Sequence, residues 1–380
     1  MTTSGDTSKR IWFWIWLALR VYTFLCGALA AYLAGTNLLA VWERWDTQYY
    51  MRIASAGYSA GDGTTTFHPL FPGLARPFSW LGGPPAIGLL LVSSCATLAL
   101  YLVFERLALL DHNSFKARTA TFLFAFWPVS YVLYLPYSES LWLLFAVLCF
   151  LFARQNRWWL AGLTGALATL TRQQGLFLLA PLAWELFATQ GYDFKRTLTR
   201  WRSWFAFSLI PAAYLGWILY RTRVLEDVRP DFSSLSTLIS STLVSPASRL
   251  VVKDHAFMWP WKAAYLAIQR ALSLSYVNPW MDLTLGALFL LLIALAWRDL
   301  RTSYRIYVVV IALVSLSFHT GMVPTGGAYL SLPRHLLLAF PVFIGLASRF
   351  EHHRVLIVMI PGLALMTFLL FGYFLVRLVP

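Results

Sequence analysis

Long apolar segments, separated by short groups of charged residues, are the feature that most restricts how this chain can fold. Of its 380 residues, 59% are hydrophobic and only 12% are charged, whereas soluble domains carry about 25% charged residues. Since about 20 consecutive apolar residues cross a bilayer, this content can supply at most about eleven transmembrane helices. The composition therefore excludes a soluble enzyme, a disordered chain and a disulfide scaffold, and it predicts an all-α polytopic membrane protein.

The apolar runs, bounded by charges or by Pro and Gly, predict a single transmembrane domain over residues 1–380. The eleven expected spans are 11–35, 86–109, 119–137, 139–153, 158–171, 175–188, 204–221, 282–297, 305–321, 333–348 and 355–377. The first run is longer than the apolar part of a signal peptide and contains Arg20. We therefore expect a retained helix, with cleavage near Ala34 as the less favoured alternative. No internal repeat is evident, so an inverted-repeat transporter is not favoured.

The net charge of +14 is explained by the bias of Lys and Arg toward the cytoplasmic side, rather than by nucleic-acid binding. With a cytoplasmic N-terminus, sixteen Lys and Arg fall in short inner segments, thirteen fall in longer outer segments, and Arg20 lies within the first span. This orientation predicts large outer loops at 36–85 and 222–281 and an outer C-terminus. The three cysteines lie in apolar runs, so no disulfide is expected.

The segment 158–188 tests this orientation. Read as one helix, it would carry the four Lys and Arg of residues 189–204 to the outer side, whereas a hairpin broken at 171–175 keeps them inside. Each arm of the hairpin has 14 residues, which span about 21 Å of a hydrocarbon core about 30 Å thick. We therefore expect Arg172, in the turn, to lie below the outer membrane surface.

The first outer loop contains a candidate interfacial helix at residues 42–56. Helical spacing places one set of apolar residues along one side and puts two acids and a tyrosine on an adjacent side. The first set is Trp42, Trp45, Tyr49 and Ile53, and the second is Glu43, Asp46 and Tyr50. This pattern fits an aromatic-lined helix with two carboxylates facing a cavity, but it also fits an ordinary interfacial helix with solvated acids.

Other polar residues are expected at membrane depth on the same outer face. Ionisable residues there are costly and usually functional. Arg172 is the clearest, Glu139 opens the fourth span, and Arg334 and His335 open the tenth. Glu139 also suits a helix N-terminus, and Arg334 also fits a snorkelling arginine. His68, in a Pro-rich turn, either contacts a substrate phosphate or hydroxyl or caps the turn.

Carboxylates from a loop helix and two recessed arginines in one outer cavity suit a substrate with a phosphate at the headgroup level and a lipid tail. The planar fork of arginine matches a phosphate with charge-assisted hydrogen bonds.

Five motifs in this chain resemble the PIG-V-type (GPI mannosyltransferase II-like) mannosyltransferases of the GT-C membrane glycosyltransferase superfamily. They cover most of the chain from about residue 42 to residue 341, and as an ordered set they are fairly specific. The motifs are Trp45-Asp46 with Tyr49, Ile53-Ala54 and Gly57-Tyr58; Phe67-His68-Pro69-Leu70-Phe71-Pro72; Tyr137-Ser138-Glu139-Ser140; Trp158-Trp159-Leu160-Ala161-Gly162 through Thr171-Arg172-Gln173-Gln174-Gly175; and Leu332-Pro333-Arg334-His335 with Phe340-Pro341.

This resemblance implies an inverting transfer of mannose, or a related hexose, from a polyprenyl- or dolichyl-phosphate-linked donor to a glycolipid or glycan acceptor on the outer or lumenal face. It selects Asp46 as the catalytic base, although geometry alone does not separate Asp46 from Glu43. Phosphate is a competent leaving group, so the implied transfer requires a base for the acceptor hydroxyl and cations for the phosphate. Arg172 and Arg334 are the phosphate candidates. The expected substrate-binding set is Glu43, Gln48, Tyr49, His68, Tyr137, Glu139, Arg172, Arg334 and His335.

No cofactor is expected. The outer loops lack an acidic or His/Asp metal motif, so we predict a metal-independent enzyme, and the absence of a P-loop or dinucleotide fingerprint argues against a nucleotide-sugar donor. The expected partners are the lipid-linked donor, its acceptor and membrane lipid, without nucleic acid, in a prokaryotic plasma membrane rather than the endoplasmic reticulum. A lipid-phosphate transporter or flippase, and a non-catalytic subunit of a glycosylation complex, are the alternative readings.

Overall fold

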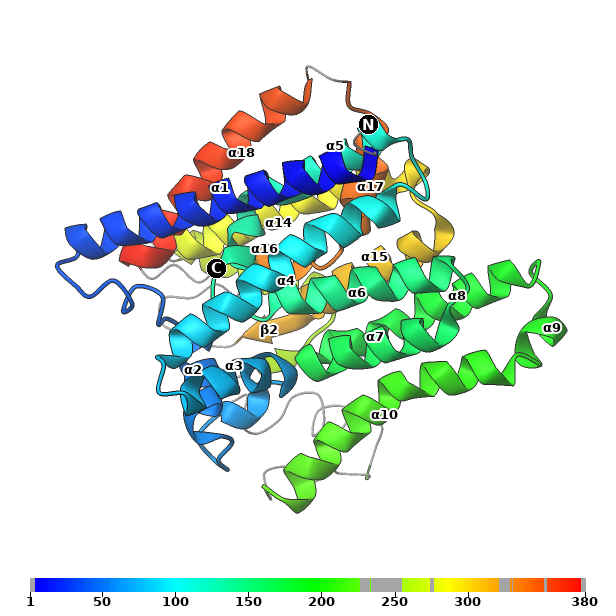
Figure 1. The fold of residues 1–380 in the computed structure, drawn as a ribbon, viewed down its shortest axis with the longest axis horizontal. Helices are drawn as coiled ribbons and strands as arrows, with labels where there is room; N and C mark the ends of the chain where they lie inside the picture. Colours follow the sequence, from blue (N-terminus) through cyan, green and yellow to red (C-terminus); the bar gives the residue numbers. More distant parts are fainter. Residues whose placement is uncertain are drawn as a thin grey trace.

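The computed structural model describes residues 4–225, 233, 255–273, 277–320, 329, 331–351 and 354–376. Its described part is almost entirely helical (Figure 1). Two three-residue strands, β1 (His255–Phe257) and β2 (Phe318–Thr320), pair antiparallel with His255 opposite Thr320. Most of the predicted second outer loop lies outside the described residues; within it, α13 (Pro260–Ser273) is a helix.

Five described helices are long and apolar enough to cross a membrane. They lie in α1 (Ser4–Leu33), α4 (Pro85–Ala108), α10 (Trp201–Arg223), α14 (Val277–Ala296) and α18 (Arg354–Phe371). A sixth crossing is formed if the 3₁₀ segment η2 (Pro128–Tyr134) and α6 (Glu139–Arg154), which meet at 100°, count as one bent span. These helices confirm an integral membrane protein of the all-α class.

Shorter elements complete the bundle and its loops. They are α5 (Ser114–Ala125), α7 (Trp158–Thr171), η3 (Gln173–Leu178), α8 (Leu179–Thr189), α9 (Phe194–Leu198), η4 (Trp297–Asp299), α15 (Thr302–Ser317), α16 (Leu332–Leu336), α17 (Pro341–Ala347) and η5 (Gly372–Val376). α10, α7, α6, α4 and α1 pack in succession (Figure 1). In the first loop, α2 (Asp46–Ala56), η1 (Thr64–Thr66) and α3 (Leu70–Trp80) pack at one end of this bundle.

Three predicted spans are interrupted within their length. Two others change structure near their end: 305–321 runs from α15 into the strand β2, and 355–377 runs from α18 into the π-helical turn η5. Residues 119–137 divide at Phe126–Trp127, because Pro128 starts a 3₁₀ segment and cannot continue the helical hydrogen bonds. Residues 333–348 divide into α16 and α17, the second of which starts at Pro341. The span 175–188 begins as the 3₁₀ segment η3 before α8. The prediction of regular helices failed where proline or a tight turn interrupts an apolar run.

The break at 171–175 is confirmed. α7 ends at Thr171, Arg172 has an extended backbone, and η3 starts at Gln173. A Cβ on Gly175 would lie 2.3 Å from the backbone nitrogen of Thr169, so the turn folds tightly back on α7 and only glycine fits. Glycine also allows α7 to approach α10, because a Cβ on Gly162 would lie 2.0 Å from the carbonyl oxygen of Ala206.

The predicted division of the 42–56 helix into two faces is wrong. The helix begins only at Asp46, because Trp45 has a φ of 51° that no helical residue adopts. Its buried residues include Tyr50 and Ile53 together. The ring centroids of Phe67 and Phe71 each lie 5.0 Å from that of Tyr50, which therefore faces the protein rather than the polar side.

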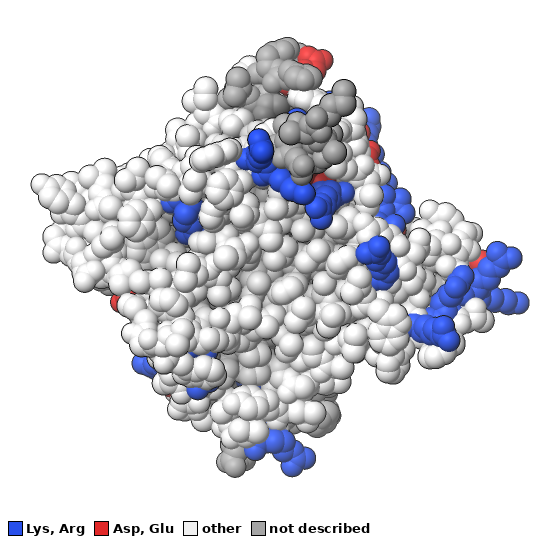
Figure 2. Space-filling view, in the orientation of Figure 1, with Lys and Arg blue, Asp and Glu red and all other residues white. Residues whose placement is uncertain are grey.

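On the face drawn in Figure 2, most Lys and Arg lie toward two ends of the molecule, with a broad and largely uncharged band between them. One group lies near α9 and the start of α1, and another lies near α2, α3 and the end of α10 (Figures 1 and 2). An uncharged band between charged ends is the surface expected of a bundle embedded in lipid. All three cysteines are free.

Candidate functional site

Arg334 is the centre of a buried ionic cluster at the α2 end of the bundle. Its Nη2 donates a hydrogen bond to Oδ2 of Asp46 at 2.7 Å, and its Nε lies 2.9 Å from Oε1 of Glu139. The side chains of Arg334 and Glu139 are only 8% and 1% exposed, whereas that of Asp46 is 23% exposed. The guanidinium of Arg334 therefore links the deeply buried carboxylate of Glu139 to the partly accessible carboxylate of Asp46.

Arg172 completes the cluster at the same carboxylate oxygen of Glu139 that Arg334 contacts. Its Nη1 hydrogen-bonds to Oε1 of Glu139 and also to the hydroxyl of Ser138, at 3.2 Å. That hydroxyl lies 2.8 Å from the phenol oxygen of Tyr50. We call Asp46, Ser138, Glu139, Arg172 and Arg334 the Asp46 cluster. Its two arginines and two carboxylates balance in charge, which is what burial of ions in a membrane protein requires.

The local structure explains why these charges lie where they do. Asp46 and Glu139 are the first residues of α2 and α6, where the positive end of the helix dipole favours an anion. Arg172 follows the last residue of α7, where the negative end favours a cation. Three helix ends therefore meet at the cluster, and the charge at each one is opposite to the charge of the helix dipole there.

Backbone strain accompanies two members of the cluster. Trp45, immediately before Asp46, has φ 51°, and Ser331, immediately before the helix that carries Arg334, has φ 64°. Positive φ is uncommon for residues other than glycine and gathers at functional sites. The strain fixes where α2 and α16 begin and so aims Asp46 and Arg334 at each other.

An aromatic wall bounds the cluster. The guanidinium of Arg334 lies 5.0 Å from the ring centroid of Tyr137, which in turn meets Tyr373 edge-on at 6.2 Å.

The second carboxylate oxygen of Glu139, Oε2, is buried and accepts no hydrogen bond from the described residues. Buried polar atoms rarely lack a partner. The cluster thus offers an acceptor atom that its own side chains do not use.

The structure places the other predicted residues around the cluster or away from it. Gln48 is exposed and its amide donates to the backbone oxygen of Glu43 at 3.1 Å, so it turns back on its own loop. The carboxylate of Glu43 forms no ion pair with the residues that the structure describes. Tyr49 stacks on Phe67 at 5.0 Å. His335 is half-buried beside Arg334 in α16.

His68 packs against α10. Its ring lies 6.3 Å from that of Tyr214 and 5.9 Å from that of Trp217, and the residue is buried. Burial lowers the pKa of His68 to about 3, although a hydrogen bond with the backbone of Thr169 opposes this shift. The imidazole is therefore neutral at pH 7. It can donate or accept one hydrogen bond, but it supplies no positive charge for a phosphate.

Two residues of this site were missed from the sequence. Ser138 and Tyr50 link Arg172 to α2 by hydrogen bonds. Their neighbours Glu139 and Tyr49 were predicted as site residues instead. Helical spacing put Tyr50 on the same side as Asp46, and its hydroxyl does reach the cluster through Ser138. Ser138 stands at the N-cap position of α6, but its hydroxyl makes no capping hydrogen bond, so the usual N-cap pattern did not indicate its contact with Arg172.

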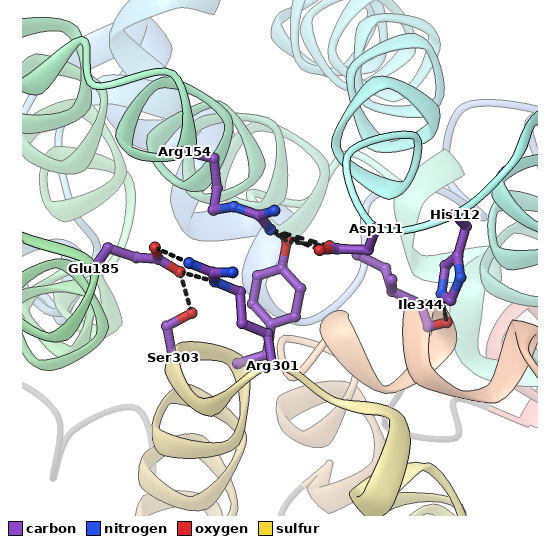
Figure 3. A network of polar contacts seen from close by, with 8 residues as sticks. Asp111, His112, Arg154, Glu185, Arg301, Ser303 and Ile344 are labelled. Atoms are coloured by element: carbon purple, nitrogen blue, oxygen red, sulfur yellow. Dashed lines mark hydrogen bonds and ion pairs between the residues drawn. The ribbon is translucent and has the colours of Figure 1, made fainter. Parts of the chain in front are cut away.

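A second polar network lies at the far end of the bundle and was not predicted (Figure 3). Arg154 pairs with Asp111 at 2.9 Å, and the hydroxyl of Tyr304 donates to Asp111 at 3.1 Å. Glu185 receives two hydrogen bonds from Arg301, at 2.7 and 2.9 Å.

Further contacts in this network tie α8, α15, α17 and the loop after α4 together. Ser303 hydrogen-bonds to Glu185, and His112 Nε2 donates to the carbonyl oxygen of Ile344 at 2.9 Å. Glu185 within the apolar run 175–188 was the sequence signal for this network. Each carboxylate of this network is paired with an arginine of the protein, so we assign the network a structural role at this end of the bundle.

Within the described residues, no group of three or more His, Cys, Asp or Glu side chains is arranged to hold a metal ion. Comparison of the chain with protein-family models, with curated proteins and with solved structures finds no match.

Proposed function

We propose that this protein is an inverting membrane glycosyltransferase that transfers mannose, or a related hexose, from a polyprenyl- or dolichyl-phosphate-linked donor to a glycolipid or glycan acceptor. One observation carries the proposal. Asp46, Glu139, Arg172 and Arg334, which come from four separate motifs of the PIG-V-type resemblance, meet in a single ionic cluster. The meeting of four motifs, far apart in the sequence, in one cluster supports the proposal that they form a common site.

The roles of the cluster residues follow from their exposure and charge. Asp46 is the accessible carboxylate, so we assign it the proton of the acceptor hydroxyl; Glu139 is sealed between two arginines and holds them in place. As the acceptor oxygen bonds to the anomeric carbon, the bond from that carbon to the phosphate oxygen breaks. The proton moves to Asp46 and the electron pair leaves with the polyprenyl phosphate, which Arg172 and Arg334 stabilise.

Donor binding and release of the base are coupled in this scheme. In the structure Arg334 occupies Oδ2 of Asp46. A donor phosphate that takes hydrogen bonds from Arg334 competes for that contact, and the carboxylate then becomes available to the acceptor hydroxyl. The enzyme would thereby hold its base in an ion pair until the donor is in place.

The membrane setting belongs to the same proposal. We propose eleven crossings in a GT-C-like arrangement, a cytoplasmic N-terminus, the Asp46 cluster on the outer face and a prokaryotic plasma membrane. Short irregular elements at the cluster, namely α16 and the turn between α7 and η3, suit a site recessed into the bilayer, where irregular backbone is tolerated only around a cavity. External labelling of a cysteine at Gly61 but not at Lys195, in a background without the native cysteines, tests the orientation.

The activity test uses purified full-length protein, radiolabelled polyprenyl-phosphate mannose and a panel of glycolipid and glycan acceptors. Transfer that disappears in Asp46→Asn but persists in Asp62→Asn supports the proposal. Asp62 is a matched control, because it is a carboxylate of the same loop that pairs with the exposed Arg52 outside the cluster. No transfer to any acceptor by the unmodified protein would reject it.

The alternative is a lipid-phosphate transporter or flippase. Arg20 favours it, because this arginine lies within α1 and its buried Nε and Nη2 donate no hydrogen bond to the described residues. A phosphate passing through the bundle could meet it there. However, Nη1 donates to the carbonyl oxygen of Tyr134 at 2.6 Å, which gives Arg20 a structural role. Movement of a fluorescent polyprenyl phosphate across proteoliposomes, without sugar transfer, would establish the transporter.

A further inference from the structure

A pocket of about 610 Å³ opens where α7 and α10 begin. Residues 156–160 and 199–203 line it, and they include three arginines, Arg157, Arg200 and Arg202, and no acidic residue. α7 separates this pocket from the Asp46 cluster, because Trp158 opens the helix at the pocket and Arg172 follows its other end. The pocket is therefore a separate feature, at the end of the bundle that carries α9 (Figure 1).

The electrostatics of the pocket favour an anion. Arg157 and Arg200 directly precede α7 and α10, and neither helix start is capped by a side chain. The positive ends of two helix dipoles thus meet three guanidinium groups, a combination that is unfavourable without a negative charge. All three arginines are exposed, and none forms an ion pair with a carboxylate of the described residues.

Two of these guanidinium groups are held in place at the rim. Arg200 Nε donates to the side-chain oxygen of Gln190 at 2.9 Å, and the guanidinium of Arg202 lies 5.4 Å from a ring centroid of Trp201. Each contact restrains an arginine without neutralising its charge. Restrained arginines lose less entropy when they bind a phosphate than free surface arginines would.

Large apolar side chains continue from the pocket along α7 and α10. Trp159 is 50% exposed, Trp201 is 66% exposed and Phe205 is 57% exposed, and the rings of Trp159 and Phe205 lie 5.6 Å apart. Tryptophan at the edge of an apolar surface marks the level of the lipid headgroups. The ligand of this pocket therefore combines a negative headgroup with hydrocarbon chains that run along these helices.

We propose that this pocket binds the phosphate of an anionic glycerophospholipid from the leaflet at the α9 end of the bundle. The arginine forks bind the phosphate oxygens, and the acyl chains lie against Trp159 and Phe205. The site goes beyond the proposed transferase activity and does not depend on it. Its occupant is a resident lipid of the membrane rather than a substrate.

The test measures lipid retention by full-length protein in detergent, using native mass spectrometry after titration with phosphatidylglycerol, phosphatidylcholine or inorganic phosphate. We expect the unmodified protein to bind phosphatidylglycerol tightly and phosphatidylcholine weakly. The triple variant Arg157→Gln, Arg200→Gln and Arg202→Gln should have a Kd for phosphatidylglycerol about 100-fold higher. Each arginine is expected to contribute roughly a fivefold factor, and the three factors multiply. Inorganic phosphate should compete only weakly, because it lacks the chains that contact the tryptophans.

The matched control removes three positive charges at the same end of the molecule but outside the pocket, with Arg10→Gln, Lys195→Gln and Arg196→Gln. These residues are exposed, so both triple variants should fold. An equal loss of phosphatidylglycerol in both variants would show general charge attraction and overturn the proposal. Equal retention of phosphatidylcholine, or complete competition by inorganic phosphate, would overturn it as well. A photoactivatable phosphatidylglycerol should crosslink within 156–160 or 199–203, and crosslinks elsewhere would count against the site.

Discussion

Arg334 and Asp46 form a hydrogen-bonded ion pair of 2.7 Å across 288 positions of the sequence. Arg334 also contacts Glu139, which is shared with Arg172, so one chain of alternating charges links α2, α6, α7 and α16. Residues of a buried ionic chain act together, because removing one leaves another charge unpaired in a medium of low dielectric. Experiments on this site must therefore separate loss of chemistry from loss of structure.

Asp46→Asn should reduce turnover by about 10²–10⁴-fold, the usual contribution of a general base. The amide keeps the shape of the side chain, and its oxygen can still accept from Arg334, so donor binding should survive. Glu43→Gln should have a smaller effect, because the carboxylate of Glu43 lies outside the ion pairs of the cluster. The measurement is kcat at saturating acceptor on monodisperse protein. Near-normal turnover in Asp46→Asn, or a larger loss in Glu43→Gln, would make Glu43 the base.

Arg172→Lys and Arg334→Lys should each weaken binding of the polyprenyl-phosphate donor by one to two orders of magnitude. Lysine keeps the positive charge that Glu139 needs but loses the planar fork, and a charge-assisted hydrogen bond contributes about 1.5–3 kcal/mol. Arg52→Lys is the control, because Arg52 pairs with Asp62 on the surface and its side chain is 57% exposed. The test is equilibrium binding of a labelled donor. Unchanged affinity in both cluster variants would place the phosphate elsewhere.

The sequence predicted the members of this site better than it predicted their arrangement. Charged residues at the ends of apolar runs stand out because burial of an ion is costly, and Glu139, Arg172 and Arg334 were found in this way. Asp46 came instead from helical spacing in the first outer loop and from the family resemblance. Their pairing was not predictable, since no local pattern relates residue 46 to residue 334. The faces of α2 were also predicted wrongly, because Tyr50 turns inward to pack against Phe67 and Phe71 from a later part of the loop.

The fold was predictable at the level of class and of most helix positions. The turn at Arg172 was predicted from charge balance and is present, whereas the interruptions before Pro128 and Pro341 were overlooked within apolar runs. Apolar content measures how much of a segment can be buried in lipid or protein, but it does not distinguish an α-helix from a 3₁₀ turn. The network around Glu185 and Asp111 was missed because its partners are also distant in sequence.

Glu185→Gln should lower the stability of the bundle by about 3 kcal/mol, because removing one partner of a buried ion pair leaves an uncompensated charge. The Glu185 side chain is 1% exposed, although that of Arg301 is 38% exposed, and solvent screening at Arg301 moderates the loss. Asp299→Asn is the control, since its pair with Arg349 is 34% and 45% exposed and should contribute under about 1 kcal/mol. Thermal unfolding in detergent compares them. Equal effects would show that the Glu185 pair is not a structural contact.

Acid should destabilise the protein through His68. Burial lowers the pKa of His68 to about 3 in the folded protein, against 6.5 for an unperturbed histidine. Below pH 6.5 the unfolded chain binds a proton that the folded protein does not, so stability falls as the pH decreases from 6.5 toward 3. His68→Phe fits the aromatic contacts with Tyr214 and Trp217 and removes the titrating group.

The shift in unfolding midpoint between pH 7.5 and pH 5 should therefore be smaller in His68→Phe than in the unmodified protein. His68→Gln provides a second comparison, because it also cannot titrate but keeps a hydrogen-bonding group toward the backbone of Thr169. Both variants should lose the same part of the pH dependence, whatever their stability at pH 7.5, since that part belongs to the imidazole. An unchanged pH dependence in both variants would mean that His68 is accessible to water and protonates in the folded state, and a role in binding a phosphate would then be restored to it.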